Sequence, residues 1–234
     1  MVIKIIDVVD LLVGFPSRRE LWATFLDVQK TRVMAEVGVW KGDFAADVLK
    51  TASHIEIYYM IDPWANLPDW NKPFNVKPET FDEIYREMDA KTAFAADKRR
   101  VLRGRTKEMV GMIPDKSLDF AYIDGDHTLR GITIDLIKMW PKIKPGGFIG
   151  GDDFTTTPWQ HDLKFEPTLV CPFSVYFAEA MNMPIAALGH GQFLIQKDEG
   201  AGFIFRDLRK LCITPPDFVK ENMLDSPLNM ARLL

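Results

Sequence analysis

The sequence has little cysteine, no long apolar run and no excess of positive charge, and each lack excludes a class of protein. Its 234 residues include two cysteines, Cys171 and Cys212, too far apart for a disulfide framework or a thiolate zinc site to be expected. No apolar run approaches the ~20 residues of a membrane span, and Lys4 and Asp7 interrupt the N-terminus too early for a secretory signal. The net charge of −4 gives no basic face for nucleic acid. We therefore expect a cytoplasmic protein that acts on a small molecule, without nucleic acid or membrane as partner; homo-oligomerisation is left open.

What the sequence does contain is an alternation of strand-like and helix-like segments. Short apolar runs indicate strands at residues 33–39, 55–61, 100–102, 120–123 and 148–149. Helical spacing of apolar residues predicts helices between them, for example over residues 43–50 and 80–94. Near-continuous apolar strands joined by helices are typical of a mostly parallel sheet covered on both faces, the doubly wound α/β architecture.

The C-terminal third contains a hairpin signal. After an expected helix over residues 173–181, apolar runs at 185–188 and 192–195 flank a Gly-His-Gly turn at 189–191. A parallel sheet finished by an antiparallel strand is a common mixed arrangement. The sequence thus predicts a mostly parallel seven-stranded sheet with an antiparallel C-terminal hairpin.

We expect this sheet to form a single domain over residues 1–234, with its core at about 33–197. Residues 1–32 are expected to be a helical lead-in and residues 198–234 an extension, with a closing helix allowed within 213–234.

Turn and loop signals divide the core further. The sequence Lys-Pro-Gly-Gly at residues 144–147 is expected to be a turn that leads into the next strand. Residues 63–78 and 155–172 fit no helix or strand, and long loops of this kind are often lids over a site.

Acidic residues follow two of the predicted strands. Asp124-Gly-Asp-His127 comes directly after residues 120–123, and Asp152-Asp153 follows the run at 148–151. Because ligands of open α/β sheets bind outside the carboxyl ends of the strands, these acids and the histidine are placed for catalysis or for a metal. The alternative is structural: Asp126 and His127 begin a helix, and Asp152-Asp153 form an ordinary turn.

The turn after the first strand contains Gly38 and Gly42, whose spacing does not match the G-x-G-x-x-G fingerprint of a dinucleotide site. Asp62 ends the second strand, where an acid can accept hydrogen bonds from ribose hydroxyls. Each feature has a structural alternative, since glycines allow tight turns and an aspartate before proline can bond nearby backbone.

Taken together, Glu36-Val-Gly-Val-Trp-Lys-Gly42 and Asp62 resemble the class I S-adenosylmethionine-dependent methyltransferases. Their first motif commonly has the form E-x-G-x-x-x-G, and their second strand ends in an acid. The sequence departs from many members at Trp40, where they have a third glycine. The resemblance implies a Rossmann-like methyltransferase fold.

Three further segments resemble the metal-dependent O-methyltransferases, such as the macrolide-sugar and catechol-type enzymes. These segments are Asp124–His127, Lys142–Gly147 and Gly151–Phe154, and the whole resemblance covers about residues 33–197. It implies transfer of a methyl group from S-adenosylmethionine to an oxygen of a small hydroxylated metabolite.

The resemblance also implies a role for each matching residue. The methionine part of the cofactor would lie against Glu36, Gly38 and Gly42, its ribose against Asp62, and its adenine near Arg105 and Thr106. Asp124 would contribute both to the cofactor site and, with Asp152 and Asp153, to a metal site. Three oxygen ligands of this kind suit Mg²⁺. His127 lies close enough to be the candidate catalytic base.

This assignment is chemically consistent. Methyl transfer from a sulfonium is an in-line displacement that requires alignment of the acceptor and removal of its proton. Bound Mg²⁺ would acidify the hydroxyl, and a histidine titrates near neutrality. Two alternatives remain open, namely a metal-dependent hydroxylase-type enzyme of the same fold and a cofactor-binding protein without catalysis.

Overall fold

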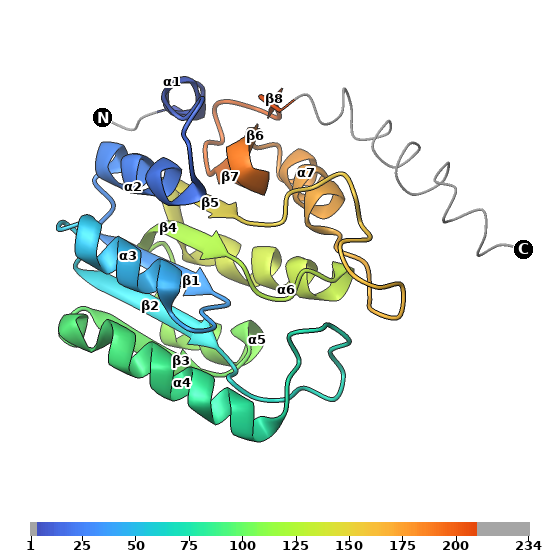
Figure 1. Ribbon diagram of the computed structural model, residues 1–234. Helices are drawn as coiled ribbons and strands as arrows, with labels where there is room; N and C mark the ends of the chain where they lie inside the picture. Colours follow the sequence, from blue (N-terminus) through green and yellow to red (C-terminus); the bar gives the residue numbers. More distant parts are fainter. Residues whose placement is uncertain (1–3, 210–234) are drawn as a thin grey trace, which may run out of the picture.

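A computed structural model describes residues 4–209 of the chain and contains one mixed sheet (Figure 1). The sheet has eight strands in the order β3-β2-β1-β4-β5-β7-β6-β8. Their bounds are β1 Val33–Val37, β2 Ile57–Asp62, β3 Arg99–Arg103, β4 Leu118–Ile123, β5 Ile143–Gly151, β6 Ile185–Leu188, β7 Gln192–Gln196 and β8 Phe205–Asp207.

The first five strands are parallel, and their order reverses direction between β1 and β4. At such a reversal the connecting segments leave the sheet on opposite sides and open a crevice at the carboxyl ends of the strands. β7 is antiparallel to both β5 and β6, and β8 pairs in parallel with β6. The fold therefore fixes the place of a ligand site between the ends of β1 and β4.

Helices cover both faces of the sheet (Figure 1). Successive side chains of a strand point to opposite faces, so the sheet has one apolar core on each face. The first four helices pack on one core and the last three pack on the other. The helices are α1 Ile5–Leu11, α2 Arg18–Gln29, α3 Asp43–Thr51, α4 Pro78–Thr92, α5 Thr106–Met109, α6 Leu129–Met139 and α7 Val170–Ala180. Short 3₁₀ helices occupy residues 93–95, 110–112, 140–142 and 189–191.

The prediction of a doubly wound, mostly parallel sheet with an antiparallel C-terminal hairpin is confirmed, with two differences of detail. The sheet has an eighth strand, β8, which is too short to show a period in the sequence. Residues 144–147 are not a turn before β5 but a bulge within it. The register with β4 jumps from the pair Leu118–Ile143 to the pair Phe120–Phe148, and Gly146 has a positive φ of 81°. The closing helix allowed within 213–234 lies outside the described residues.

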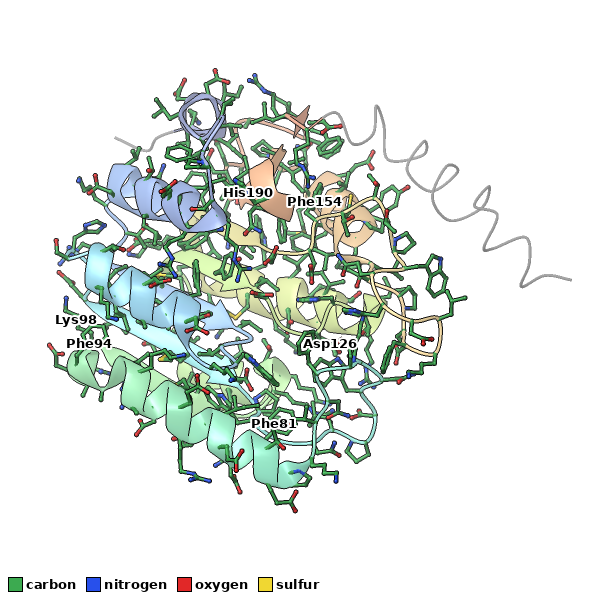
Figure 2. The ribbon with its side chains drawn as sticks, viewed as in Figure 1. Phe81, Phe94, Lys98, Asp126, Phe154 and His190 are labelled. Atoms are coloured by element: carbon green, nitrogen blue, oxygen red, sulfur yellow. The ribbon has the colours of Figure 1, made fainter. Side chains whose placement is uncertain are left out.

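Two long loops, residues 63–77 and 155–169, leave the same end of the sheet (Figure 1). They are joined by hydrogen bonds, since Asn71 Nδ2 donates to the Lys164 carbonyl at 2.8 Å and Glu166 N donates to the Asn71 carbonyl at 3.2 Å. Asp126 lies at this end, whereas Phe94 and Lys98 lie at the opposite end (Figure 2). No helix within residues 4–209 combines the length and apolar character needed to cross a membrane.

Candidate functional site

A cavity of about 720 Å³ opens at the carboxyl ends of β1, β2 and β4. Eight of the predicted site residues line it: Glu36, Gly38, Asp62, Arg105, Thr106, Asp124, His127 and Asp153. Gly42 and Asp152 are outside the cavity lining within residues 4–209. The sheet therefore brings most of the predicted site residues to one place.

Two glycines shape the turn between β1 and α3, each for a different reason. Gly38 has a φ of +85°, and a Cβ there would lie 2.0 Å from the carbonyl oxygen of Asp124. Only glycine lets this turn lie directly against the end of β4. Gly42 has a φ of +74°, and a Cβ there would meet Cγ of Met88 on α4 at 2.9 Å. Gly42 thus serves packing of the turn, and its predicted contact with the cofactor stays a prediction.

The buried side chain of Asp62 holds the same turn in place by hydrogen bonds. Its carboxylate accepts hydrogen bonds from the backbone N–H groups of Val39 at 3.0 Å, Trp40 at 2.9 Å and Trp64 at 2.7 Å. Burial raises the pKa of Asp62, and these backbone donors oppose that rise. A carboxylate has roughly four lone-pair sites, so acceptor capacity remains for a ligand hydroxyl. The predicted ribose contact stays a prediction beside this structural role.

Glu36 is fixed by a neighbouring strand. The hydroxyl of Tyr58 on β2 donates to Glu36 Oε2 at 2.8 Å, and the Glu36 side chain is buried. Burial raises the pKa of Glu36 well above its usual value despite that hydrogen bond. Glu36 therefore presents a positioned carboxyl group to the cavity rather than a freely solvated charge.

The predicted adenine end of the cavity contains a buried acid that sequence reasoning missed. Asp135 on α6 lines the cavity beside Thr106, and burial raises its pKa to about 7, although a hydrogen bond with Thr106 opposes the rise. Asp135 lies on the apolar face of α6, next to Ile132 and Leu136 in the helical period. An acid at an apolar position of an amphipathic helix was the signal that could have revealed it.

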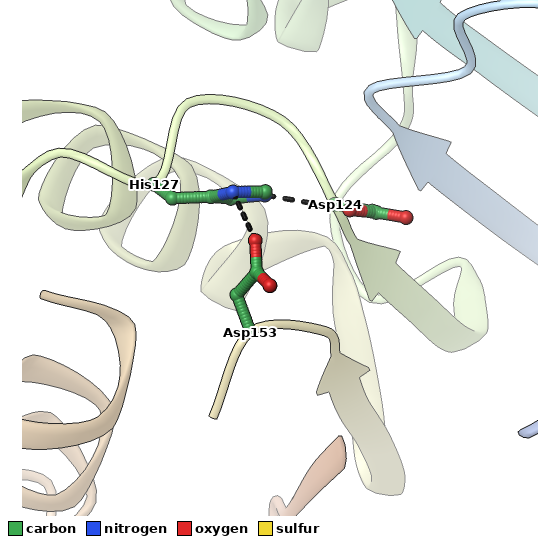
Figure 3. Close-up of side chains that lie close together, drawn as sticks. All are labelled: Asp124, His127 and Asp153. Carbon is green, nitrogen blue, oxygen red and sulfur yellow. Dashed lines mark ion pairs between the residues drawn. The ribbon is translucent and has the colours of Figure 1, made fainter. Parts of the chain in front are cut away.

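Asp124, His127 and Asp153 converge at the ends of β4 and β5 (Figure 3). His127 Nδ1 forms a close ion pair with Asp153 Oδ2, and His127 Nε2 lies 3.3 Å from Asp124 Oδ1. Burial alone would lower the pKa of His127, but the two carboxylates outweigh it and raise the pKa to about 10. In the absence of a bound cation, this imidazole is protonated at neutral pH.

The same three side chains have the chemistry of a cation site. One ligand atom from each lies within 4.8 Å of the others, the one such group among His, Cys, Asp and Glu of residues 4–209. Two carboxylates and one imidazole form a mixed oxygen and nitrogen donor set, which suits Mg²⁺ less specifically than three carboxylates and also suits Mn²⁺ or Zn²⁺. The residues present therefore fit a divalent cation.

Asp152 is not one of the three residues of this cluster. Its Oδ1 accepts a hydrogen bond from Gln192 Nε2 at 2.6 Å, and its Oδ2 forms a close ion pair with Arg18 Nη1. Arg18 Nη1 also lies 3.6 Å from Asp124 Oδ2. Sequence reasoning missed Arg18 and Gln192, because neither lies in a motif and each is far along the chain from the acids that it contacts. The predicted role of Asp152 as a metal ligand stays a prediction.

The two long loops close over the cavity through specific polar contacts. Trp70 Nε1 donates to Asp126 Oδ1 at 3.0 Å, and the carboxylate of Asp69 receives Arg105 at 2.5 and 3.0 Å and Arg130 at 3.1 Å. Lys72 is buried and donates to the Glu166 carbonyl at 2.8 Å. These side-chain contacts hold the loops of residues 63–77 and 155–169 over the cavity, and we call the two loops the cover.

A family profile described as a methyltransferase domain matches residues 35–154, just over half of the chain. The matched span runs from β1 through β5 and contains the turn between β1 and α3, Asp62, and the acid cluster described above. The chain therefore belongs to this methyltransferase family. No curated protein sequence matches the chain.

Solved structures share the fold at low sequence identity. One is a Staphylococcus aureus protein provisionally assigned as a caffeoyl-CoA O-methyltransferase, with 15% identity, a TM-score of 0.57, and coverage of 83% of this chain and 92% of that chain. An O-methyltransferase from Bacillus cereus in complex with SAH has 15% identity, a TM-score of 0.55, and coverage of 81% and 88%. An SAH-bound methyltransferase from Podospora anserina has 13% identity, a TM-score of 0.53, and coverage of 81% and 86%. The expected resemblance to class I methyltransferases is confirmed in family and in fold.

Proposed function

We propose that this methyltransferase transfers a methyl group from S-adenosylmethionine to a hydroxyl oxygen of a small metabolite. The observation that carries the proposal is the position of Asp124, which lies against the cofactor turn at Gly38 and also belongs to the charged cluster with His127 and Asp153. A methyl donor and an acceptor hydroxyl would meet at this point. The two similar structures with bound SAH support the choice of cofactor, and a volume of about 720 Å³ accommodates a cofactor-sized ligand.

The reaction requires the acceptor oxygen to be aligned with the methyl group and to lose its proton. We propose His127 as the group that receives that proton. Because Asp124 and Asp153 raise its pKa to about 10, His127 can act as a base only after positive charge elsewhere compensates the two carboxylates. A divalent cation bound there would supply that charge and acidify the hydroxyl.

We propose Asp124 and Asp153 as the principal ligands of that cation, with Mg²⁺ as the predicted metal. Two arrangements differ in the third ligand of the cation. The predicted ligand Asp152 requires its ion pair with Arg18 to open, whereas His127 already faces both carboxylates. If His127 is the third ligand, the base must be another group. Binding of Mn²⁺ in single variants separates the two arrangements without reference to turnover.

The cation assignment is tested by titrating Mn²⁺ into the protein and following its electron paramagnetic resonance signal. Asp124→Asn and Asp153→Asn are expected to weaken binding by at least roughly tenfold, because each removes a charged ligand. Asp152→Asn should weaken binding less than His127→Gln if the imidazole is the third ligand, and more if Asp152 is. Unchanged binding in both Asp124→Asn and Asp153→Asn would refute a cation site at this cluster.

The reaction itself is tested by calorimetric titration with S-adenosylhomocysteine in Mg²⁺ and in EDTA, followed by incubation of hydroxylated acceptors with S-adenosylmethionine and mass analysis. Saturable cofactor binding and a product that gains a methyl group are expected. A product that gains an oxygen atom instead would indicate the hydroxylase-type alternative, and binding without turnover on any acceptor would favour a non-catalytic cofactor-binding protein.

A further inference from the structure

Arg18 enters the cavity from a part of the chain that precedes the matched methyltransferase domain. It begins α2, and Trp22 lies one turn later on the same helix face. Trp22 is fully buried against Phe120, with ring centroids 5.2 Å apart, and its Nε1 donates to Gln192 Oε1 at 2.7 Å. The start of α2 is therefore anchored to β4 and β7, and the position of Arg18 is set by that anchor.

The support for the Arg18 side chain is itself fixed. Gln192 is fully buried, and its Oε1 accepts hydrogen bonds from both Trp22 and Tyr122, which leaves its Nε2 to donate to Asp152 Oδ1 at 2.6 Å. The Asp153 N–H donates to the same Asp152 oxygen at 2.8 Å. Only Oδ2 of Asp152 then faces Arg18. Asp152 therefore acts as a rigid carboxylate that holds one nitrogen of the guanidinium.

The Arg18 side chain lines the cavity and keeps part of its surface accessible. The Arg18 side chain is 47% exposed although it is paired, and the closest contact of its ion pairs with Asp152 and Asp124 is through Nη1 in both cases. An arginine has five N–H donors in a planar fork, so an edge that is held in place on one side can bind a planar oxyanion on the other. The geometry favours a carboxylate as the ligand.

Opposite charges lie side by side at this wall of the cavity. Asp124 Oδ2 is 3.6 Å from Arg18 Nη1, and the buried Glu36 is close enough for the charge of Arg18 to act on its pKa. The methionine end of S-adenosylmethionine is a zwitterion, with an ammonium and a carboxylate on the same carbon. Arg18 and Asp124 match that pair of charges, with Arg18 facing the carboxylate and Asp124 facing the ammonium.

We propose that Arg18 binds the α-carboxylate of the cofactor's methionine and that Asp152 positions it for this task. The inference rests on the proposed use of S-adenosylmethionine and extends it to a residue outside the matched domain. It gives Asp152 a role in cofactor binding that does not depend on a metal.

The test compares two ligands that differ in the amino-acid group at the methionine end. S-adenosylhomocysteine contains the amino-acid group, whereas 5′-methylthioadenosine keeps the adenosine and the thioether and lacks it. Arg18→Gln is expected to weaken S-adenosylhomocysteine binding by roughly 10- to 100-fold in calorimetry and to leave 5′-methylthioadenosine binding unchanged. Arg18→Lys should give a smaller loss, since it keeps the charge but not the fork.

Arg19→Gln is the matched control, because Arg19 is the next residue of α2 and pairs at 2.7 Å with Asp47 on α3, outside the cavity lining. It should bind both ligands as the wild type does, and thermal unfolding should show that all variants are folded. Equal losses for the two ligands in Arg18→Gln, or no loss for either, would overturn the inference. Failure of the wild type to bind S-adenosylhomocysteine would instead overturn the proposed function together with this inference.

Discussion

The two sides of the cavity are held in different ways. On the side of β1 and β2, Asp62 holds the turn between β1 and α3 through backbone N–H groups, and Gly38 lies against the backbone of Asp124. On the side of β4 and β5, side-chain charges that come from distant segments pair with one another, as His127 does with Asp153. Backbone contacts keep one geometry whatever is bound. Side-chain ion pairs can exchange partners, so we expect the second side to respond to ligand, metal and pH.

The variant Gly38→Ala disturbs the side of the cavity that is held by backbone contacts, and it is expected to combine a loss of stability with a loss of ligand binding. The added Cβ would lie 2.0 Å from the carbonyl oxygen of Asp124, and the positive φ of 85° is costly for alanine. We expect a loss of about 3 kcal/mol in the free energy of unfolding, measured in urea, and loss of S-adenosylhomocysteine binding.

Gly14→Ala is the matched control for this variant. Gly14 has a similar φ of +79°, but nothing lies within 4 Å of a Cβ there. It should lose only about 1 kcal/mol, the cost of the backbone conformation alone. Equal losses in the two variants would show that the close approach of the turn to β4 has no energetic consequence.

The same contrast explains which parts of the site the sequence could predict. Strand ends and a glycine-containing turn are local patterns, so Gly38, Asp62 and Asp124 could be placed in one crevice from the sequence alone. The rule that parallel strands end at the same edge of a sheet was sufficient for that placement. Glu36, Arg105 and Thr106, which also line the cavity, were placed through the resemblance to known methyltransferases rather than by that rule.

The side-chain network could not be found in this way. Arg18 and Gln192 reach Asp152 from 134 and 40 residues away in the sequence, and no local pattern records such a contact. The bulge at residues 144–147 was mistaken for a turn because proline and glycine favour both. Asp135 was within reach of prediction, since its place on the apolar face of α6 is visible in the helical period.

A second test concerns the charge on His127. Its pKa in the folded protein, about 10, exceeds the usual 6.5, so the imidazolium stabilises the fold fully below pH 6.5 and progressively less as the pH rises toward 10. We expect the wild type in EDTA to lose on the order of 3 kcal/mol of unfolding free energy over that interval, in excess of any loss by His127→Gln.

His161→Gln is the control for this comparison. His161 lines the same cavity, and its ring contacts are with Phe74 and Phe165 rather than with carboxylates. This variant should keep the pH dependence of the wild type. If His127→Gln showed the same dependence as the wild type, the ion pairs of His127 would not contribute to stability.

The smallest effect on stability is expected for the surface ion pairs that hold the loop of residues 63–77. Asp69→Asn keeps the shape of the side chain but removes the charge that binds Arg105 and Arg130. Because exposed ion pairs contribute little to stability, we expect the melting temperature to change little. We expect faster amide hydrogen exchange in residues 63–77 and faster dissociation of S-adenosylhomocysteine, both measured at low salt. Asp115→Asn, which breaks an exposed pair with Lys142 far from the loops, is the control and should change neither rate.

The pH dependence of the cover distinguishes it from the His127 cluster. The hydrogen bond from Arg105 lowers the pKa of Asp69 to about 2, so the contact is complete above pH 4 and is lost only as the pH falls toward 2. Between pH 6.5 and 10, exchange in residues 63–77, corrected for the intrinsic effect of pH, should therefore stay constant while the stability of the whole protein declines. A parallel change in both would mean that the cover and the cluster open together, and the cover would not be held independently of the His127 cluster.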